Sequence, residues 1–239
     1  MRVGSLFSGI GGIDLGLERA GMKVVWQVEN NEFCQKVLKR HWPEVPCYGD
    51  IKEIDFTTLP AVDLICGGFP CQPWSNAGRR QGTADARNLW PETLRAVRES
   101  KPRWCLFENV PGILTHKYFG RIIGDLAESG YCVEWSVLSA CSMGAPHSRE
   151  RLFILSYSDS VNDSIQSREK EKIFERTWGT ESRRVSGWTS EPDVGRVAHG
   201  IPARVDRLKC LGNAVVPQVA EWIGRRIMEA EATSHKEGR

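Results

Sequence analysis

The chain has 239 residues, of which 41% are hydrophobic and 26% are charged, and its net charge is +2. These values are those of a globular protein with one substantial core, and the small net charge says little about a binding partner. No apolar run approaches the roughly 18 residues that a membrane-spanning helix needs. The N-terminal apolar stretch is too short for a signal peptide, so we expect a cytoplasmic protein with no membrane contact.

The eight cysteines point neither to a disulfide framework nor to a metal centre. No secretory signal accompanies them, and no two are spaced as a CxxC pair. Structural zinc sites usually need such a pair, and disulfides need an oxidising compartment. We therefore expect no metal, and we expect most of the cysteines to be reduced and buried.

The first 155 residues alternate strand-like and helix-like segments. Apolar and β-branched runs predict strands at 3–7, 23–29, 62–66, 104–107, 133–138 and 152–155, with a short one at 47–51. Helical spacing predicts helices that carry Ile13 and Leu17, Phe33 and Val37, Leu89 to Val97, and Phe119 to Leu126. This alternation predicts an α/β fold, a mostly parallel sheet with helices on both faces.

The pattern changes beyond residue 155. Residues 156–200 are rich in serine and in charges of both signs, which is typical of a small irregular lobe or a linker. Order returns near Leu211. Asn213 is predicted to cap a helix that has Pro217 in its first turn and Val219 and Ile223 in its apolar stripe.

Glycines follow the first strand, where a doubly wound sheet binds its ligand. Phe7 to Gly12 includes Gly9, Gly11 and Gly12, which let the backbone turn tightly and approach a ligand closely. No basic residue follows them, which favours an adenosine cofactor without phosphates over a dinucleotide. The alternative is a turn that only connects a strand to a helix.

Acidic residues stand at the ends of the next two strands. Glu29 ends the second strand, where a carboxylate can accept hydrogen bonds from ribose hydroxyls. Asp50 and Ile51 end the following strand, where they could hold an adenine edge. These positions favour a cofactor site over a simple connecting turn.

Cys71 stands in the most informative segment, Gly67-Gly68-Phe69-Pro70-Cys71-Gln72-Pro73. Two glycines precede it and prolines flank it, so the backbone is restricted and a packing role is unfavourable. A cysteine on a constrained loop at the end of a strand, beside a cofactor site, is a candidate nucleophile. An inert loop cysteine is the alternative, because reactivity needs a shifted thiol pKa.

Glu108 emerges where the buried run Leu106-Phe107 ends, one strand–helix unit after Cys71. This placement puts its carboxylate on the same rim as the thiol, where it could act as an acid–base partner. A solvated residue at the rim is the alternative.

Arg149 and Arg151 alternate at the start of a strand, so both side chains should project from one face. Two convergent guanidinium groups suit a phosphate or a carbonyl oxygen. The alternative is a pair of surface salt bridges.

Together these segments resemble the cytosine-5 DNA methyltransferase family. Five motifs occur in the family's order and cover nearly the whole chain outside 156–200. They are Phe7 to Gly12 as the cofactor loop, Pro70-Cys71-Gln72 as the nucleophile loop, Glu108-Asn109-Val110 as the acid motif, His147 to Arg151 as the Gln-x-Arg-x-Arg motif, and Gly212 to Pro217 as the segment that completes the cofactor pocket. His147 stands where the family usually has Gln.

The resemblance implies a Rossmann-like, S-adenosylmethionine-dependent methyltransferase fold. Residues 1–155 would form the catalytic domain, 156–207 a small target-recognition lobe or linker, and 208–239 a segment that returns to the catalytic domain. The family's recognition domain is usually larger than the stretch available here.

The resemblance also implies roles for the reacting residues. Cys71 would add to carbon 6 of a cytosine flipped out of double-stranded DNA. Glu108 would protonate or hydrogen-bond ring nitrogen 3, and Arg151 would hold the base carbonyl oxygen. Arg149 would steady the loop or the backbone.

The cofactor contacts follow in the same way. Phe7 would pack against the adenine of S-adenosylmethionine, Pro70 and Leu89 would lie on its methionine side, and Asn213 with Ala214 would hold the methionine moiety. The implied enzyme is a monomer within a restriction–modification system, with a cognate restriction endonuclease as a candidate companion.

Three alternatives stay open. The substrate could be a structured RNA, as in a tRNA-methylating branch of the family. The chain could be a DNA-binding relic, which the intact set of Cys71, Glu108 and Arg151 argues against. A nicotinamide-dependent oxidoreductase would explain the glycine loop but not Pro70-Cys71-Gln72.

Overall fold

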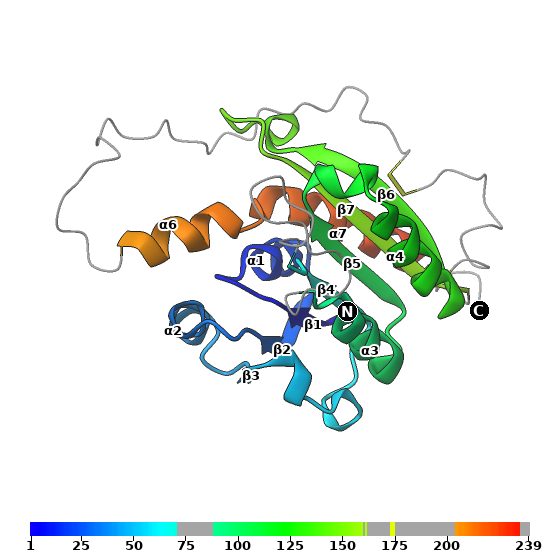
Figure 1. Cartoon of the computed structure of the whole chain (residues 1–239), viewed down its shortest axis with the longest axis horizontal. Coiled ribbons are helices and arrows are strands. Elements are labelled where there is room, and N and C mark those ends of the chain that lie inside the picture. Colours follow the sequence, from blue (N-terminus) through cyan, green and yellow to red (C-terminus); the bar gives the residue numbers. More distant parts are fainter. Residues whose placement is uncertain (71–87, 160, 162–172, 175–203, 235–239) are drawn as a thin grey trace.

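A seven-stranded sheet forms the centre of the protein, with the strand order β3-β2-β1-β4-β5-β7-β6. The computed structural model describes residues 1–70, 88–159, 161, 173–174 and 204–234 (Figure 1). The strands are β1 (Arg2–Leu6), β2 (Lys23–Val28), β3 (Cys47–Tyr48), β4 (Leu64–Gly67), β5 (Trp104–Asn109), β6 (Tyr131–Ser139) and β7 (Glu150–Ser158). The first five strands run parallel, while β7 is antiparallel to both β5 and β6. The expected mostly parallel sheet is confirmed.

Helices cover both faces of this sheet (Figure 1). They are α1 (Gly12–Arg19), α2 (Glu32–His41), α3 (Trp90–Ser100), α4 (Lys117–Glu128), α6 (Arg204–Asn213) and α7 (Pro217–Ser234), with short 3-10 turns η1 (Ile51–Glu53), η2 (Phe56–Thr58), η4 (Pro111–Thr115) and η5 (Ala140–Met143). Leu17 of α1 and Ile223 of α7 lie in the core on one face, and Val97 of α3 and Ile122 of α4 lie in the core on the other.

The burial of β5 explains why its sequence is a continuous apolar run. Trp104, Cys105, Leu106 and Phe107 all have no exposed surface, because helices pack on both faces of this strand. The strand therefore fixes the position of its last residues, Glu108 and Asn109, at the carboxyl edge of the sheet.

Two local expectations are corrected by the structure. Asn213 does not cap the last helix, because it is the final residue of α6, and α7 begins only at Pro217. The sequence pattern does not predict helix α6, because nearly all of its residues are exposed and form no buried apolar face. In α2 the buried face carries Cys34 and Leu38 and is offset from the Phe33–Val37 stripe.

Several expectations concern residues that the structure does not describe. Cys71 lies outside the described residues, as does most of the 156–207 region expected to form a small lobe.

Strand β7 continues to Ser158, so the sheet extends slightly beyond residue 155. In the part of the chain that is described, no helix is long and apolar enough to span a membrane.

Candidate active site

A cavity of about 340 Å³ opens at the carboxyl ends of the parallel strands. This is a size typical of small-molecule sites, and the location is where α/β sheets bind their ligands. Most of the expected site residues line it, namely Phe7, Gly9, Gly12, Glu29, Pro70, Glu108, Arg151, Asn213 and Ala214. Segments far apart in the sequence therefore meet in one place.

The loop after β1 is held against the end of β2 by Glu29. The Glu29 carboxylate accepts hydrogen bonds from the Gly9 and Asn31 backbone N–H groups, each at 2.8 Å. The loop has unusual backbone angles, with φ values of 50° at Phe7 and 55° at Gly9. A positive φ at a phenylalanine costs energy and tends to occur at functional sites.

The buried carboxyl group of Asp14 also supports the loop after β1, through a chain of hydrogen bonds. The Ser5 hydroxyl and the Gln27 side-chain amide each donate to Asp14 at 2.6 Å, and the Ser8 hydroxyl donates to Ser5. Burial raises the pKa of Asp14 to about 6, although the two hydrogen bonds oppose the shift. The sequence does not predict this cluster, because a lone aspartate in a helix gives no signal of its burial.

The segment between α6 and α7 closes the other side of the cavity. A Cβ atom on Gly12 would lie only 2.4 Å from the Val215 carbonyl oxygen, so only glycine allows this approach. The Arg149 guanidinium donates to the carbonyl oxygens of Gly212 and Ala214. It thereby holds Asn213 and Ala214 in the cavity wall.

Glu108 and Arg151 form an ion pair in the wall of the cavity. The Arg151 Nε atom lies 2.9 Å from Glu108 Oε1, and both residues are largely shielded from solvent. Burial raises the pKa of Glu108 to about 7, and the charges of Arg151 and Arg149 reduce this shift. A Cβ atom on Gly68 would lie 2.7 Å from Glu108 Oε2, so the glycine leaves room for the carboxylate.

Asn109 connects the acid to the loop that carries the candidate nucleophile. Its side-chain amide donates to the Phe69 carbonyl oxygen at 3.2 Å, and its own oxygen accepts from the Val110 N–H group. The Phe69 ring packs below against Trp90 and Phe107. Asn109 therefore positions the backbone immediately before Pro70 and Cys71, a role not assigned from the sequence.

Arg149 and Arg151 do not form the convergent pair expected from strand alternation. Strand β7 begins only at Glu150, and Arg149 has a φ of 32°, so the alternation does not apply to it. Arg149 donates to the backbone of Gly212 at the end of α6 and of Ala214 just after it, whereas Arg151 pairs with Glu108.

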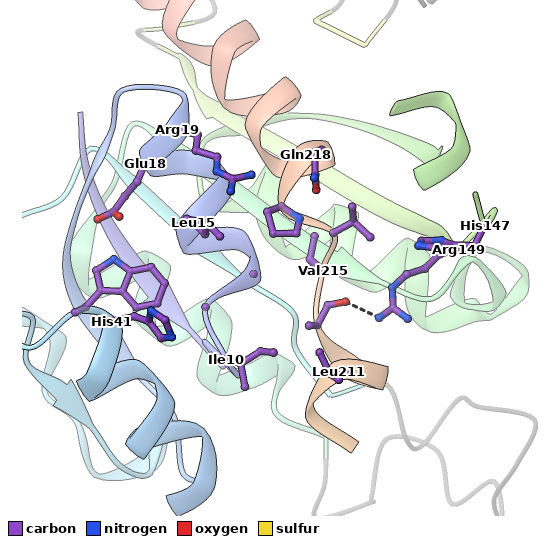
Figure 2. Close-up of a pocket in the computed structure, with 16 residues that line it drawn as sticks. Ile10, Leu15, Glu18, Arg19, His41, His147, Arg149, Leu211, Val215 and Gln218 are labelled. Carbon is purple, nitrogen blue, oxygen red and sulfur yellow. Dashed lines mark hydrogen bonds between the residues drawn. The ribbon is translucent and has the colours of Figure 1, made fainter. Parts of the chain in front are cut away.

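Gly11 and Arg149 line a neighbouring cavity of about 760 Å³ on the other side of the glycine loop. Figure 2 shows this cavity between α1 and the 211–218 segment, with Arg149 bonded to a backbone carbonyl. The wall between the two cavities contains Gly12 and Ala214, which line both.

Asp50, Ile51 and Leu89 are not among the residues that line the smaller cavity. Asp50 is exposed and caps η1 by accepting from the Lys52 N–H group, and Ile51 is buried in the core. Leu89 precedes α3 and packs on the same core.

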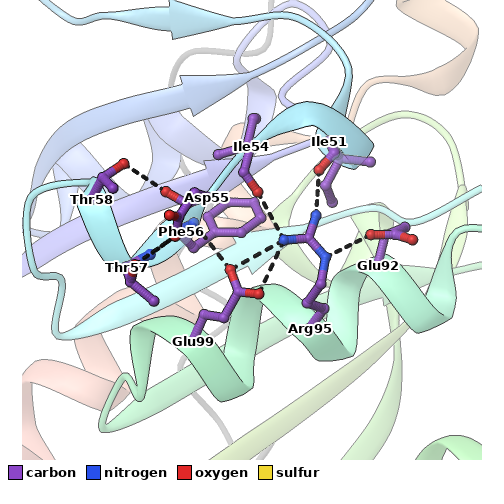
Figure 3. A network of polar contacts seen from close by, with 9 residues as sticks. All are labelled: Ile51, Ile54, Asp55, Phe56, Thr57, Thr58, Glu92, Arg95 and Glu99. Carbon is purple, nitrogen blue, oxygen red and sulfur yellow. Dashed lines mark hydrogen bonds and ion pairs between the residues drawn. The ribbon is translucent and has the colours of Figure 1, made fainter.

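The segment after β3 is held in place by Arg95 of α3 (Figure 3). The Arg95 guanidinium donates to the carbonyl oxygens of Ile51 and Ile54 and forms ion pairs with Glu92 and Glu99.

Within the described ranges, no group of three or more His, Cys, Asp or Glu side chains could hold a metal ion.

Comparison with known proteins identifies the family. The model of the C-5 cytosine-specific DNA methylase family matches residues 1–199. The chain belongs to this family. It is 38% identical over 164 residues to the type II methyltransferase M.BsuFI of Bacillus subtilis, a match that covers 66% of this chain and 40% of that protein. It is also 34% identical over 179 residues to M.HhaI of Haemophilus parahaemolyticus, covering 73% and 54% of the two chains.

A solved structure supports the fold assignment. A DNA modification methyltransferase encoded within an E. coli prophage is 30% identical and superposes with a TM-score of 0.58, covering 68% of this chain and 48% of that chain. This similarity confirms the methyltransferase fold. The chain spans about half the length of the curated relatives that it matches.

Proposed function

We propose that the protein is a DNA (cytosine-5-)-methyltransferase that transfers a methyl group from S-adenosylmethionine to carbon 5 of cytosine. One observation carries this proposal: a single cavity joins the glycine loop and Glu29 to the Glu108–Arg151 pair. A cofactor and a base bound there would lie side by side. The naming of M.BsuFI and M.HhaI as type II methyltransferases supports DNA as the substrate.

The residues of the cavity suit S-adenosylmethionine. Phe7 offers an aromatic face for the adenine, and Glu29 keeps carboxylate lone pairs for the ribose hydroxyls beyond the two backbone bonds it accepts. Pro70 would contact the methionine part, and Asn213 with Ala214 would hold its polar end. Contacts of Asp50, Ile51 and Leu89 with the cofactor stay predictions.

Cys71 starts the reaction in this proposal. Its thiolate adds to carbon 6 of the cytosine, and this covalent adduct makes carbon 5 nucleophilic. When bound, S-adenosylmethionine would supply an electrophilic methyl group to that carbon. Loss of the carbon 5 proton and breakage of the bond to Cys71 would then release the methylated base and the free thiolate. The cytosine must first leave the duplex, at a cost of a few kcal/mol.

Glu108 and Arg151 stabilise the charge that the adduct places on the ring. With a pKa of about 7, Glu108 can hold a proton near neutral pH and donate it to ring nitrogen 3. Arg151 would hold the base carbonyl oxygen, so both partners are fixed before the reaction begins. Asn109, which follows Glu108 in β5, fixes the position of the Phe69–Pro70 backbone relative to Glu108.

The organisation of the protein follows from the same proposal. Residues 1–155 and 208–239 would form the catalytic domain, and 156–207 a small recognition lobe. The enzyme would act as a monomer on double-stranded DNA in the cytoplasm. It would belong to a restriction–modification system, beside a cognate restriction endonuclease.

Methyl transfer from radiolabelled S-adenosylmethionine tests the function. Purified protein is incubated separately with duplex DNA and with tRNA. Label in DNA is the expected result, label only in tRNA would replace the substrate, and label in neither would contradict the activity. Bisulfite sequencing of DNA from cells that express the protein then identifies the methylated sequence.

A further inference from the structure

Two cysteines that are 176 residues apart in the sequence meet in the wall of the cofactor cavity. The Sγ atoms of Cys34 on α2 and Cys210 on α6 lie 3.2 Å apart, and both side chains are buried. Both residues line the cavity that contains Glu29 and Asn213. Figure 1 shows α6 next to α2, away from the centre of the sheet.

Cys210 provides the buried side chain of helix α6, and the Arg149 guanidinium also holds the helix end through the Gly212 carbonyl oxygen. Among residues 205–213 only Cys210 is buried, and the apolar side chains of Val205, Leu208 and Leu211 are more than half exposed. A disulfide bond would require the two sulfur atoms to approach by roughly 1 Å. Because no other side chain among residues 205–213 is buried, this small shift would disturb little packing.

We propose that Cys34 and Cys210 form a redox modification site, in which oxidation by a small peroxide joins them in a disulfide that tethers α6 to α2. With hydrogen peroxide, one thiol loses its proton, and the thiolate attacks a peroxide oxygen, which breaks the O–O bond and gives a sulfenic acid and hydroxide; the hydroxide takes up the lost proton and leaves as water. The second thiol displaces water from that sulfenic acid. In total two S–H bonds and one O–O bond break, one S–S bond and two O–H bonds form, and two waters leave.

Two features set the rate of this oxidation: the small fraction of thiolate, and access of the oxidant through the cavity. Burial first, and the contact with Cys210 second, raise the pKa of Cys34, so the reactive thiolate is scarce near neutral pH. Since both thiols line the cavity and little of either is otherwise exposed, a small oxidant reaches them from that side. Bound S-adenosylmethionine should therefore shield the pair, an effect that rests on the proposed function.

The test is oxidation of the full chain by hydrogen peroxide, followed by peptide mass spectrometry without reduction. We expect a linked peptide pair that contains Cys34 and Cys210, absent from Cys34→Ala and Cys210→Ala but retained in Cys47→Ala. Closing a loop of this length should also raise the Tm by about 10 °C over the reduced protein. The exposed Cys141 serves as an internal reference for the oxidant.

Adding S-adenosylmethionine at about ten times its Kd should slow formation of the linked pair roughly tenfold, in proportion to the empty fraction. Oxidation of Cys141 should not change. Oxidised Cys141 without any linked pair, or a linkage of either thiol to Cys71, would overturn the proposal. Calorimetry distinguishes failure of the proposed function from failure of the proposed disulfide. Absence of cofactor binding contradicts the function, whereas the disulfide is tested by the linked peptide alone. Cofactor that binds without slowing the linkage would overturn the shielding.

Discussion

Arg151 and Glu108 form an ion pair, with 2.9 Å between Nε and Oε1, in the wall of the cavity. Burial favours a neutral Glu108, whereas the arginine favours a charged one. The result is a carboxyl group with a pKa of about 7, which can carry a proton or release it near neutral pH. This balance is what a general acid for ring nitrogen 3 requires.

Replacing Glu108 by Gln should lower kcat by about 10²–10⁴, the usual contribution of a general acid. Cofactor affinity should change little. The wild-type kcat should fall as the pH rises above about 7, because the acid form of Glu108 is lost there. Initial rates with saturating substrates, measured below and above pH 7, test whether Glu108 is the general acid. A Glu108→Gln variant with the same fall of kcat at high pH would contradict this role.

Glu29→Ala should weaken S-adenosylmethionine binding by about 1–3 kcal/mol, because it removes a hydrogen-bonded carboxylate. Glu29→Gln should weaken it less, since one amide oxygen can still accept from either Gly9 or Asn31. Isothermal calorimetry measures both variants, with cofactor-free DNA affinity as the control. Unchanged cofactor affinity in Glu29→Ala would assign the ribose to another partner.

Arg149→Met should raise the Kd for S-adenosylmethionine roughly tenfold, because hydrogen bonds from a charged donor are worth about 1.5–3 kcal/mol. The substitution frees the Gly212 and Ala214 carbonyls and loosens the cavity wall. Arg19→Met is the matched control, since Arg19 lines the same neighbouring cavity. Equal effects of the two substitutions would show that general charge, and not the backbone contact, matters.

Asp14→Asn should reduce the pH dependence of stability. The pKa of Asp14 rises from 3.8 to about 6 on folding, so its contribution to stability is complete below 3.8 and is lost as the pH rises through 6. Between pH 5 and pH 8 the free energy of unfolding should therefore fall by about 1–2 kcal/mol more in the wild type than in the variant. Urea unfolding at both pH values measures this difference, and identical slopes would contradict it.

The sheet and the site motifs could be predicted from the sequence because their signals are local. A buried strand such as β5 is a continuous apolar run, and the glycines of Phe7 to Gly12 indicate a loop. Placement at a strand end is a weaker signal. Glu29 lines the cavity, whereas Asp50 caps η1 and is not among the lining residues, and periodicity cannot distinguish the two.

Other features depend on long-range contacts that the sequence does not show. Strand alternation predicts that Arg149 projects beside Arg151, but a positive φ at Arg149 accompanies its contacts with the Gly212 and Ala214 carbonyl oxygens, which suit the backbone-steadying role implied by the family resemblance. The meeting of Cys34 with Cys210 likewise depends on how α6 lies against α2. Asn109 could have been suggested by its place in the motif after Glu108, but its partner at Phe69 could not.

The central claim is that Cys71 attacks the cytosine, and covalent trapping tests it most directly. A random-sequence duplex that contains 5-fluorocytosine is incubated with S-adenosylmethionine and analysed on a denaturing gel. The wild type should remain bound to the DNA, because fluorine cannot leave as a proton after methylation. Cys71→Ser should fold and bind the cofactor, but it should neither trap nor methylate, since a hydroxyl provides almost no anion at neutral pH. Near-normal turnover by Cys71→Ser would contradict the mechanism.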